Sequence, residues 1–423
     1  MTRRRHLRHA AAAAAGAAAL AGGGALAFGP LAPWLVQHIG DGQKIWRLGH
    51  LSLSGVRGAH LGALHVDHLA LADGQGVWAE AEDVSLRWRP FDILRGSVRL
   101  DEIEAARLHI LRKPALSSPS KSGGPDFDVD LTALHVRRIE LDAPAAGVAA
   151  IMRLDLGLFV KDDALKRLDL ALLRLDAPSD RANIQYRDEH GMRLAAEIVG
   201  AREGVFAHLL GNENEALRID ASGQGAAAAG EASLTGRIAE RPLIEAALSW
   251  RGADWRLRAG AHLAATPVLA DLHARFGDAL SIEAAGVRNG AFTAHFAAPN
   301  LTGALSAEKT DGLALIGPAR IVADTRDLHR AAPEILVTAG PAHLEGGLTS
   351  QGGRTELNVA LTAQDVQTAG QTVSLQGPAR VRFSKAGVEG RADLAVTTHR
   401  SPLLDGARLT LALSYDRSRS RFA

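Results

Sequence analysis

The chain has 423 residues, of which 47% are hydrophobic and only 4% are aromatic. Its 48 Lys and Arg residues nearly balance its 47 Asp and Glu residues, and a formal net charge of +1 excludes the basic field that nucleic-acid binding requires. The 44 glycines and 16 prolines favour a turn-rich all-β chain over a helical bundle. Cysteine is absent, so stability must come from burial and sheet hydrogen bonds without disulfides.

The amino terminus has the pattern of a membrane anchor. Residues 2–8 are basic, and residues 10–29 carry no charged or strongly polar side chain. About 20 apolar residues of helix cross a bilayer core, and upstream arginines hold that end in the cytoplasm. The sequence therefore predicts a cytoplasmic basic segment at residues 1–9 and a transmembrane signal anchor at residues 10–29. The residues taken to represent the anchor are Ala10, Leu20, Leu26 and Phe28.

Two other interpretations of this segment stay open. The small residues at 25–27 (Ala-Leu-Ala) fit a cleavage site, which would make the segment a removed signal peptide. Arg3 and Arg4, followed by Leu7, loosely resemble a twin-arginine export signal. All three interpretations place the rest of the chain outside the cytoplasm, so export is the common prediction.

Residues 41–113 are predicted to form an amino-terminal β region. Residues 77–81 alternate apolar and polar side chains, and the apolar positions then shift by one to Val84, Leu86 and Trp88. Period-two alternation indicates a strand with one buried face, and such a shift indicates a bulge or a bend. Residues 90–95, between a proline and Gly96, are predicted to form one helical turn.

Histidines and aspartates in this part of the chain do not have the pattern of a metal site. His60, His65 and His68 lie in strand-like sequence, where positions three apart point to opposite faces. A zinc site needs three or four convergent ligands, and the alternating aspartates of residues 126–130 do not have the spacing of a calcium loop. Solvated strand residues are the preferred interpretation, and we expect no metal and no cofactor.

Residues 114–126 are rich in Ser, Pro and Gly and are predicted to be a flexible linker. Beyond them, residues 127–423 repeat the strand pattern in units of about 10–14 residues, as successive strands and turns do. Residues 182–186 and 192–196, joined by a polar turn at residues 188–191, indicate a hairpin. No sustained helical period follows residue 40.

The strands must bury their apolar faces, against a second sheet or around an apolar ligand. The faces consist of Leu, Val, Ile and Ala, with few of the aromatic residues that fill the core of a sandwich. The sequence has no Gly-x-Ser-x-Gly motif, no phosphate-binding loop and no cysteine nucleophile. We expect no enzymatic activity and name no catalytic residue; an exported β-rich hydrolase is a minor alternative, because triads are recognised by geometry.

Several motifs follow one another between residues 73 and 113: D-G-x-G-V-W at 73–78, D-x-x-x-x-W-R-P at 83–90, L-R-G at 94–96, D-x-I-E-A-A-R-L at 101–108 and a closing R-K-P. In this order and spacing they resemble the amino-terminal region of TamB, the inner-membrane component of the translocation and assembly module, in the AsmA-like group. The resemblance covers about residues 1–115.

This resemblance implies a long antiparallel sheet, curled lengthwise into a β-taco-like groove with an apolar interior, after an amino-terminal transmembrane helix. It implies a single-pass inner-membrane protein with its body in the periplasm. The implied function is phospholipid transport between the inner and outer membranes. The alternative is assembly of outer-membrane β-barrel proteins and autotransporters with the partner TamA.

The groove candidates are the aliphatic residues of the clearest alternating segments. They are Val84, Leu86, Met152, Leu154, Leu156, Leu158, Val160, Leu168, Leu170, Leu172, Leu357, Val359, Leu361, Leu409, Leu411 and Leu413. Members of the family are usually longer, and the chain ends soon after the last of these segments. The body is therefore expected to be truncated, which leaves contact with TamA open.

Overall fold

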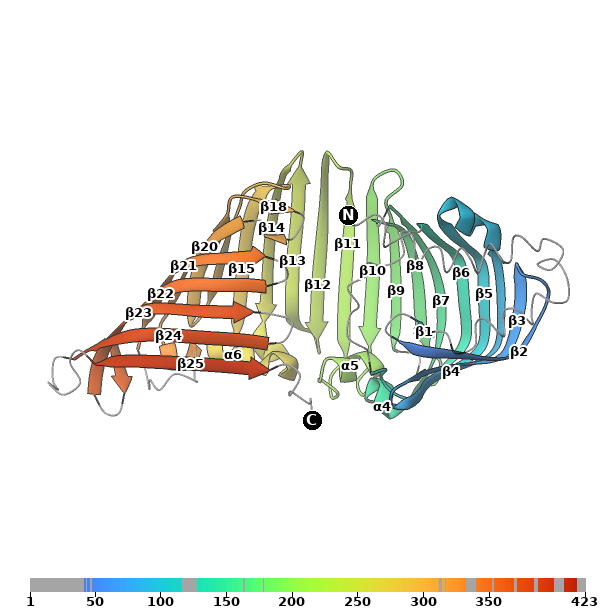
Figure 1. The fold of residues 1–423 in the computed structure, drawn as a ribbon, viewed down its shortest axis with the longest axis horizontal. Helices are drawn as coiled ribbons and strands as arrows, with labels where there is room; N and C mark the ends of the chain where they lie inside the picture. The colour runs from blue at the N-terminus through green and yellow to red at the C-terminus, as the bar shows by residue number, and fades with distance from the viewer. Residues whose placement is uncertain are drawn as a thin grey trace. The chain divides into compact units, whose positions relative to one another are not determined.

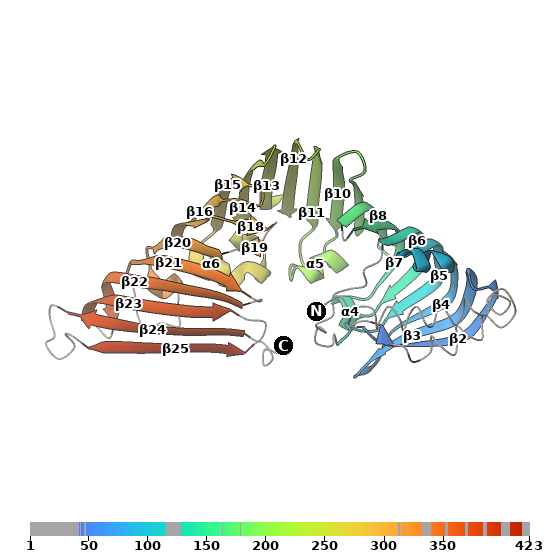
Figure 2. The ribbon, with the colours of Figure 1, turned by 45° about the horizontal axis from the view of Figure 1, so that its top comes forward.

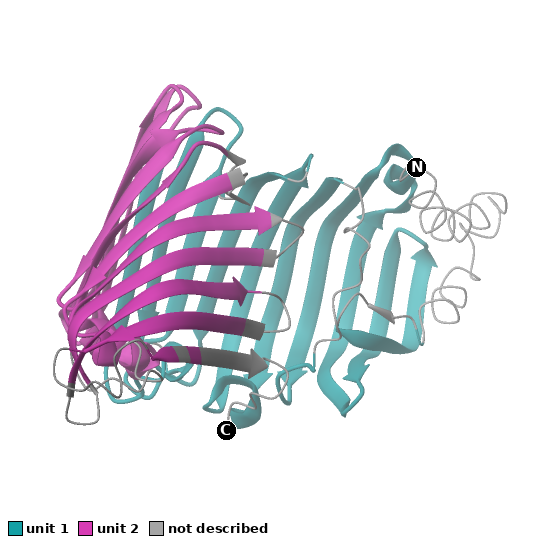
Figure 3. Ribbon diagram, turned by 60° about the vertical axis from the view of Figure 1, so that its left-hand side comes forward, with its two compact units in different colours: residues 1–224 teal, residues 225–423 magenta. Residues whose placement is uncertain are grey.

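The structure is a computed structural model that describes most of the chain between residues 42 and 416. The described residues are 42, 44–45, 48–115, 128–162, 164–177, 179–311, 314–315, 317–331, 340–351, 354–368, 371–383, 387–398 and 407–416. They belong to two compact units, residues 1–224 (unit 1) and residues 225–423 (unit 2), which Figure 3 colours teal and magenta. Strands dominate both units (Figure 1), so the predicted all-β class is confirmed.

The predicted membrane anchor at residues 10–29 lies outside the described residues, together with Ala10, Leu20, Leu26 and Phe28. Within the part of the chain that the structure describes, no helix is long and apolar enough to cross a membrane. The transmembrane helix therefore stays a prediction from sequence.

Unit 1 is built from strands that lie beside their neighbours in sequence. Its strands are β1 (Lys44–Ile45), β2 (Gly49–His60), β3 (Ala63–Asp73), β4 (Gly76–Arg89), β5 (Ser97–Ile110), β6 (Asp128–Leu141), β7 (Ala150–Lys161), β8 (Ala164–Arg174), β9 (Arg181–Arg187), β10 (Met192–Gly200) and β11 (Leu217–Gly225). From β1 to β10 each strand pairs with the next, and all of these pairs except β5–β6 are antiparallel. The predicted hairpin across residues 188–191 is β9–β10 and is confirmed.

The parallel pair β5–β6 corrects the expectation of a wholly antiparallel sheet. Ser97 lies opposite Asp128 and Ile110 lies opposite Leu141, so the chain returns along the length of β5 before β6 begins. Parallel neighbours need a long connection, and the predicted linker falls within the connection between these two strands. Residues 116–126 of that predicted linker lie outside the described residues, and the boundary between the compact units lies at residues 224 and 225.

The predicted shift of apolar parity lies at an irregularity that neighbouring strands share. Asp83 has φ 55° and Gly55 has φ 68°, and each is skipped in the register of its strand pair together with Asp67, which lies opposite both of them. Because one residue is skipped on each strand, the strands remain in register and the apolar side chains stay on one face after the shift. The predicted helical turn is also present, as the 3-10 helix η1 (Pro90–Arg95), followed by Gly96 with φ 78°.

The irregularity at Asp67 changes the interpretation of the histidines. The register of β3 skips Asp67, so His65 and His68 share a face, contrary to the expectation for a regular strand. His65 Nε2 lies 3.3 Å from Asp67 Oδ1 and 3.4 Å from Asp83 Oδ1. Among the described residues, no group of three or more His, Cys, Asp or Glu side chains is arranged to hold a metal ion.

Unit 2 repeats the antiparallel arrangement. Its strands are β12 (Ala229–Ile238), β13 (Arg241–Arg251), β14 (Asp254–His262), β15 (Ala279–Val287), β16 (Phe292–Ala298), β17 (Leu301–Ala307), β18 (Thr310–Asp311), β19 (Ala314–Leu315), β20 (Gly317–Thr325), β21 (Ala342–Gln351), β22 (Arg354–Thr368), β23 (Gln371–Phe383), β24 (Gly387–Thr397) and β25 (Arg408–Asp416). Consecutive strands pair from β12 to β17 and from β20 to β25, and β17 pairs with β20. The short strands β18 and β19 pair only with each other within the described residues.

Short helices interrupt the strand pattern in both units, and the sequence did not predict them. They are α4 (Ala143–Ala146) and α5 (Val205–Leu209) in unit 1, and η2 (Leu263–Ala265), η3 (Pro267–Leu269), α6 (Ala270–Phe276) and α7 (Leu328–Ala331) in unit 2. Segments this short contain too few turns to show a helical period. In unit 1, α4 and α5 lie at the end of the strands opposite η1, and in unit 2 these helices likewise lie at one end of the strands (Figure 2).

Glycines let aromatic rings of unit 2 lie flat on the sheet. A Cβ atom added to Gly303 would meet the Phe296 ring at 2.4 Å and the Val322 carbonyl oxygen at 2.4 Å. A Cβ atom added to Gly230 would meet the Trp250 ring at 2.1 Å. Each ring covers the glycine that is its register partner on the neighbouring strand.

We expect Gly303→Ala to destabilise unit 2 by about 1–3 kcal/mol, because the new methyl group overlaps a ring and a backbone oxygen. The matched control is Gly260→Ala, at a strand position with no atom within 4 Å of the new Cβ. Urea unfolding of the two variants checks this expectation. Equal urea midpoints for the two variants would show that packing of the Phe296 ring does not require glycine at position 303.

Candidate functional site

In unit 1 the strand register aligns apolar residues in continuous rows on one face of the sheet. One row, from β2 to β10, is Val56, Val66, Val84, Ala105, Val136, Leu154, Leu172, Ala182 and Ile198. The row beside it is Leu64, Leu86, Ile103, Leu134, Leu156, Leu170, Ile184 and Ala196. We call this surface the apolar face of unit 1. At about 4.8 Å per strand it extends about 40 Å across the strands.

Much of this face is not covered by other described residues. Leu154, Leu156 and Leu158 of β7 and Leu168 and Leu170 of β8 are each only half-buried. Leucines in a closed core are usually fully buried. The apolar face of unit 1 therefore presents aliphatic surface that a second layer would normally cover.

The face is closed at the end where α4 and α5 lie. The buried cluster there comprises Ala105, Val136, Ile139, Ala150 and Met152 of the strands, with Ala146 of α4 and Val205 of α5. Met152 is 2% exposed, whereas Leu154, two residues along the same face, is half-buried. The helices thus divide the face into a covered end and an open remainder.

The opposite face of the sheet carries ion pairs that join adjacent strands, such as β6 and β7, and strands two apart, such as β6 and β8. Arg167 Nη2 lies 3.1 Å from Asp130 Oδ1, and His135 Nδ1 lies 2.7 Å from Asp155 Oδ1. Hydrogen bonds from His135 and Arg153 hold the pKa of Asp155 below its usual value. Half-exposed pairs of this kind contribute about 0–1 kcal/mol each, so their main effect is to keep this face wet and the register fixed.

Unit 2 has a corresponding apolar face of different composition. One row, from β12 to β24, is Ala232, Leu248, Leu257, Ala284, Ala294, Leu305, Ile321, Gly346, Val359, Ala379 and Ala392. About half of this row is alanine or glycine, whereas unit 1 uses mainly Leu, Ile and Val. At its helical end, Leu328 of α7 completes a buried cluster with Leu361, Ala363 and Val366.

The structure places the predicted groove residues as follows. Val84, Leu86, Leu154, Leu156, Leu158, Val160, Leu168, Leu170 and Leu172 lie in register on the apolar face of unit 1 and are half-buried, and Met152 lies on that face under the helices. Leu357, Val359 and Leu361 lie in register on the apolar face of unit 2, the last two buried. The backbone positions of Leu409, Leu411 and Leu413 pair with Leu394, Ala392 and Gly390.

Sequence reasoning missed the aromatic residues of the apolar face of unit 2. Trp250 pairs with Trp255 across β13 and β14, and Phe292 lies one strand beyond Gly286 in the same row. The signal was present, because Leu248 and Trp250 alternate with polar residues before a Gly-Ala turn, and Trp255 and Leu257 do so after it.

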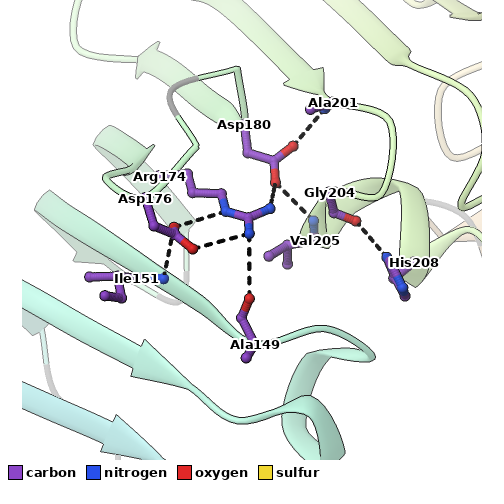
Figure 4. A network of polar contacts seen from close by, with 9 residues as sticks. All are labelled: Ala149, Ile151, Arg174, Asp176, Asp180, Ala201, Gly204, Val205 and His208. Atoms are coloured by element: carbon purple, nitrogen blue, oxygen red, sulfur yellow. Dashed lines mark hydrogen bonds and ion pairs between the residues drawn. The ribbon is translucent and has the colours of Figure 1, made fainter.

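Sequence reasoning also missed a buried polar network at the closed end of unit 1 (Figure 4). Arg174 ends β8, and its Nε donates to Asp176 Oδ1 at 2.9 Å while its Nη1 donates to Asp180 Oδ2 at 3.2 Å. Asp180 is 0% exposed and also accepts the backbone N–H groups of Ala201 at 2.6 Å and Val205 at 2.8 Å. The Arg174 guanidinium lowers the pKa of Asp176. The network fixes α5 to the turn between β8 and β9.

The fold and these faces define a class of protein: an all-β protein with long apolar sheet faces that its own described residues leave partly uncovered. Residues 13–419 match the model of the YdbH-like family, described as intermembrane phospholipid transport protein YdbH, and the chain belongs to this family. No curated protein matches the chain, and no solved structure matches it. The match supports the AsmA-like expectation in its broader form, whereas the specific assignment to TamB gains no support.

We expect Asp180→Ala to release α5 from the sheet. The change leaves two backbone N–H groups without an acceptor and Arg174 with one carboxylate, and breaking a buried pair costs about 3–5 kcal/mol. Hydrogen exchange of residues 205–209 should become much faster. The control is Asp169→Ala, whose pair with Arg187 is half-exposed. Unchanged exchange in the Asp180 variant would show that α5 is held by apolar contacts alone.

Glu140 provides a pH-dependent contribution to unit 1. Hydrogen bonds from Arg107 and Arg138 lower its pKa from 4.5 to about 2. Because the pKa falls on folding, the stabilisation is complete above pH 4.5 and is lost as the pH falls toward about 2. Thermal unfolding between pH 6 and pH 2 should therefore depend less steeply on pH in Glu140→Gln. Identical profiles for the variant and the unchanged protein would contradict this linkage.

Proposed function

We propose that this protein carries phospholipids between the inner and outer membranes, with the acyl chains lying on the apolar faces of its two units. The observation that carries the proposal is the row of half-buried leucines, Leu154, Leu156 and Leu158 with Leu168 and Leu170, on a sheet whose other face is ionic. The YdbH-like match supports phospholipid as the ligand class.

The physical role of the face is to keep hydrocarbon out of water along a path. Covering apolar surface is worth about 25 cal/mol per Å², so an acyl chain on these leucines is stabilised at each position along the sheet. Aliphatic side chains offer no directional bond to the chain. A ligand can therefore move from strand to strand without breaking hydrogen bonds, which suits a conduit better than a storage site.

Inner-membrane attachment belongs to the same proposal. The basic residues 2–8 and the apolar residues 10–29 support a single-pass anchor with the amino terminus in the cytoplasm and both units in the periplasm. The protein would act without a cofactor and without catalysing a covalent step, since displacement of lipid along a surface requires neither.

A second candidate function is assembly of outer-membrane β-barrel proteins, with a client strand paired to a sheet edge. The observation that favours it is β25, which pairs with β24 on one side and with no other described strand on its far side. Exposed edges accept strands of other chains. TamA would be the outer-membrane partner in this case.

The test uses two leucines of β8 on opposite faces. Leu170 is half-buried on the apolar face, and Leu173 is 37% exposed on the ionic face. With a photo-crosslinking residue at either position in living cells, we expect phospholipid adducts at Leu170 and not at Leu173. Mass spectrometry of the adducts distinguishes the two candidates, because outer-membrane protein adducts would favour assembly.

The same pair tests function. We expect Leu170→Glu to impair the outer-membrane barrier, since a carboxylate on the apolar face opposes passage of hydrocarbon. Leu173→Glu should leave the barrier intact, because the new charge joins an ionic face. Normal barrier function in a folded and abundant Leu170→Glu protein would contradict lipid transport along this face.

A further inference from the structure

The two ends of the apolar face of unit 2 are chemically different. At one end, where β14 finishes at His262 and β15 starts at Ala279, η2, η3 and α6 occupy the connection. At the other end the connections are short turns, and the last apolar row contains Trp250, Trp255 and Phe292. A ligand lying along the strands would therefore meet helices at one end and indole rings at the other.

The aromatic residues form a contiguous group. Trp250 and Trp255 are direct register partners, and the ring centroids of Trp255 and Phe292 are 6.3 Å apart with an interplanar angle of 34°. The Trp250 indole Nε1–H donates to the Ala226 carbonyl oxygen at 2.7 Å, so the polar edge of the ring is directed to the turn and its body covers Gly230. Tryptophan takes this position where hydrocarbon gives way to polar groups.

A cation lies beside this group. The turns at this end are residues 226–228, 252–253 and 288–291, and Arg288 is the one charged residue in them. Its Nη2 donates to the Ala227 carbonyl oxygen at 3.4 Å, next to the acceptor of Trp250, and no described carboxylate forms an ion pair with it. An exposed guanidinium with free donors matches a phosphate oxygen.

Between the two ends the face has room for hydrocarbon. Ala284 and Ala294 follow Gly286 and Phe292 on the apolar face, so the side chains next to the aromatic group are small on β15 and β16. On β13 and β14, Leu248 and Leu257 follow the tryptophans, with Ala246 and Ala259 beyond them. The nine residues of β14 span about 30 Å at about 3.3 Å per residue. One leaflet of a bilayer core is about 15 Å thick, so an acyl chain fits along the strand.

We propose that Trp250, Trp255, Phe292 and Arg288 form a binding site for the phosphate end of a glycerophospholipid. The acyl chains run from this site over Leu248, Leu257 and the alanines toward α6. The site fixes the orientation of the lipid on unit 2, with the head group at the turns. This inference rests on the proposed function and adds a direction and a recognition site to it.

The test uses two photoreactive phospholipids incorporated into membranes that contain the full-length protein. One carries the reactive group on the head group and the other at the end of an acyl chain. We expect the head-group probe to label peptides containing residues 252–253 and 288–291, and the acyl probe to label residues of β14 and α6. Peptide mass spectrometry locates both labels.

The outcomes separate the inference from the function on which it rests. Acyl labels on the apolar face with head-group labels at the helical end, or spread along both ends, would overturn the inference and leave lipid transport intact. If neither probe labels the apolar faces or the turns beside them, both the inference and the proposed lipid transport would be overturned.

A charge variant adds a second measurement. Arg288→Gln keeps an exposed polar side chain and should reduce head-group labelling of the turns by about tenfold, the value of one hydrogen bond to a charged group. The control is Arg258→Gln, which is 83% exposed on the ionic face of β14, near Glu283, and should leave labelling unchanged. Equal labelling in the two variants would overturn the role of Arg288.

Discussion

The register of the strands is the constraint on which the rest of this structure depends. Side chains alternate along a strand with period two, so a slip of one residue would exchange the apolar and ionic faces. The apolar parity shifts at Gly55, Asp67 and Asp83, but these residues lie opposite one another on β2, β3 and β4, so the strands stay in register. In β5 and β6 the same number of residues separates the paired leucines and isoleucine on both strands. Leu100 therefore pairs with Leu131, and Ile103 pairs with Leu134. The apolar rows therefore remain continuous.

An apolar face that is only half-buried leaves hydrocarbon in water unless other residues or a ligand cover it. At one end of unit 1, α4 and α5 cover the apolar face. The Arg174 and Asp180 side chains attach α5 to the sheet through hydrogen bonds. Elsewhere the leucines of β7 and β8 are half-buried, and in the proposed function a lipid covers them. The ionic face, with pairs such as Arg167 and Asp130, keeps the reverse side of the sheet in water.

The two units offer different surfaces to that ligand. Unit 1 fills its rows with Leu, Ile and Val, whereas unit 2 combines alanine and glycine with Trp250, Trp255 and Phe296. Glycines beneath the rings allow the rings to lie on the sheet instead of standing away from it. The result in unit 2 is a surface with small side chains beside flat aromatic ones, which can hold a ligand more specifically than uniform aliphatic surface.

Sequence by itself determined the all-β class, the residues of the apolar rows, the parity shifts and the turn at Pro90–Arg95, because each depends on local periodicity or turn chemistry. It also named residues that share the apolar face of unit 1, Leu156 and Leu170 among them. Only the tertiary structure decided that β5 and β6 are parallel, that Met152 is covered while Leu154 is open, and that Arg174 is buried. Alternation shows that a side chain belongs to the apolar face, but what covers it depends on residues distant in sequence, such as Val205, which no local pattern encodes.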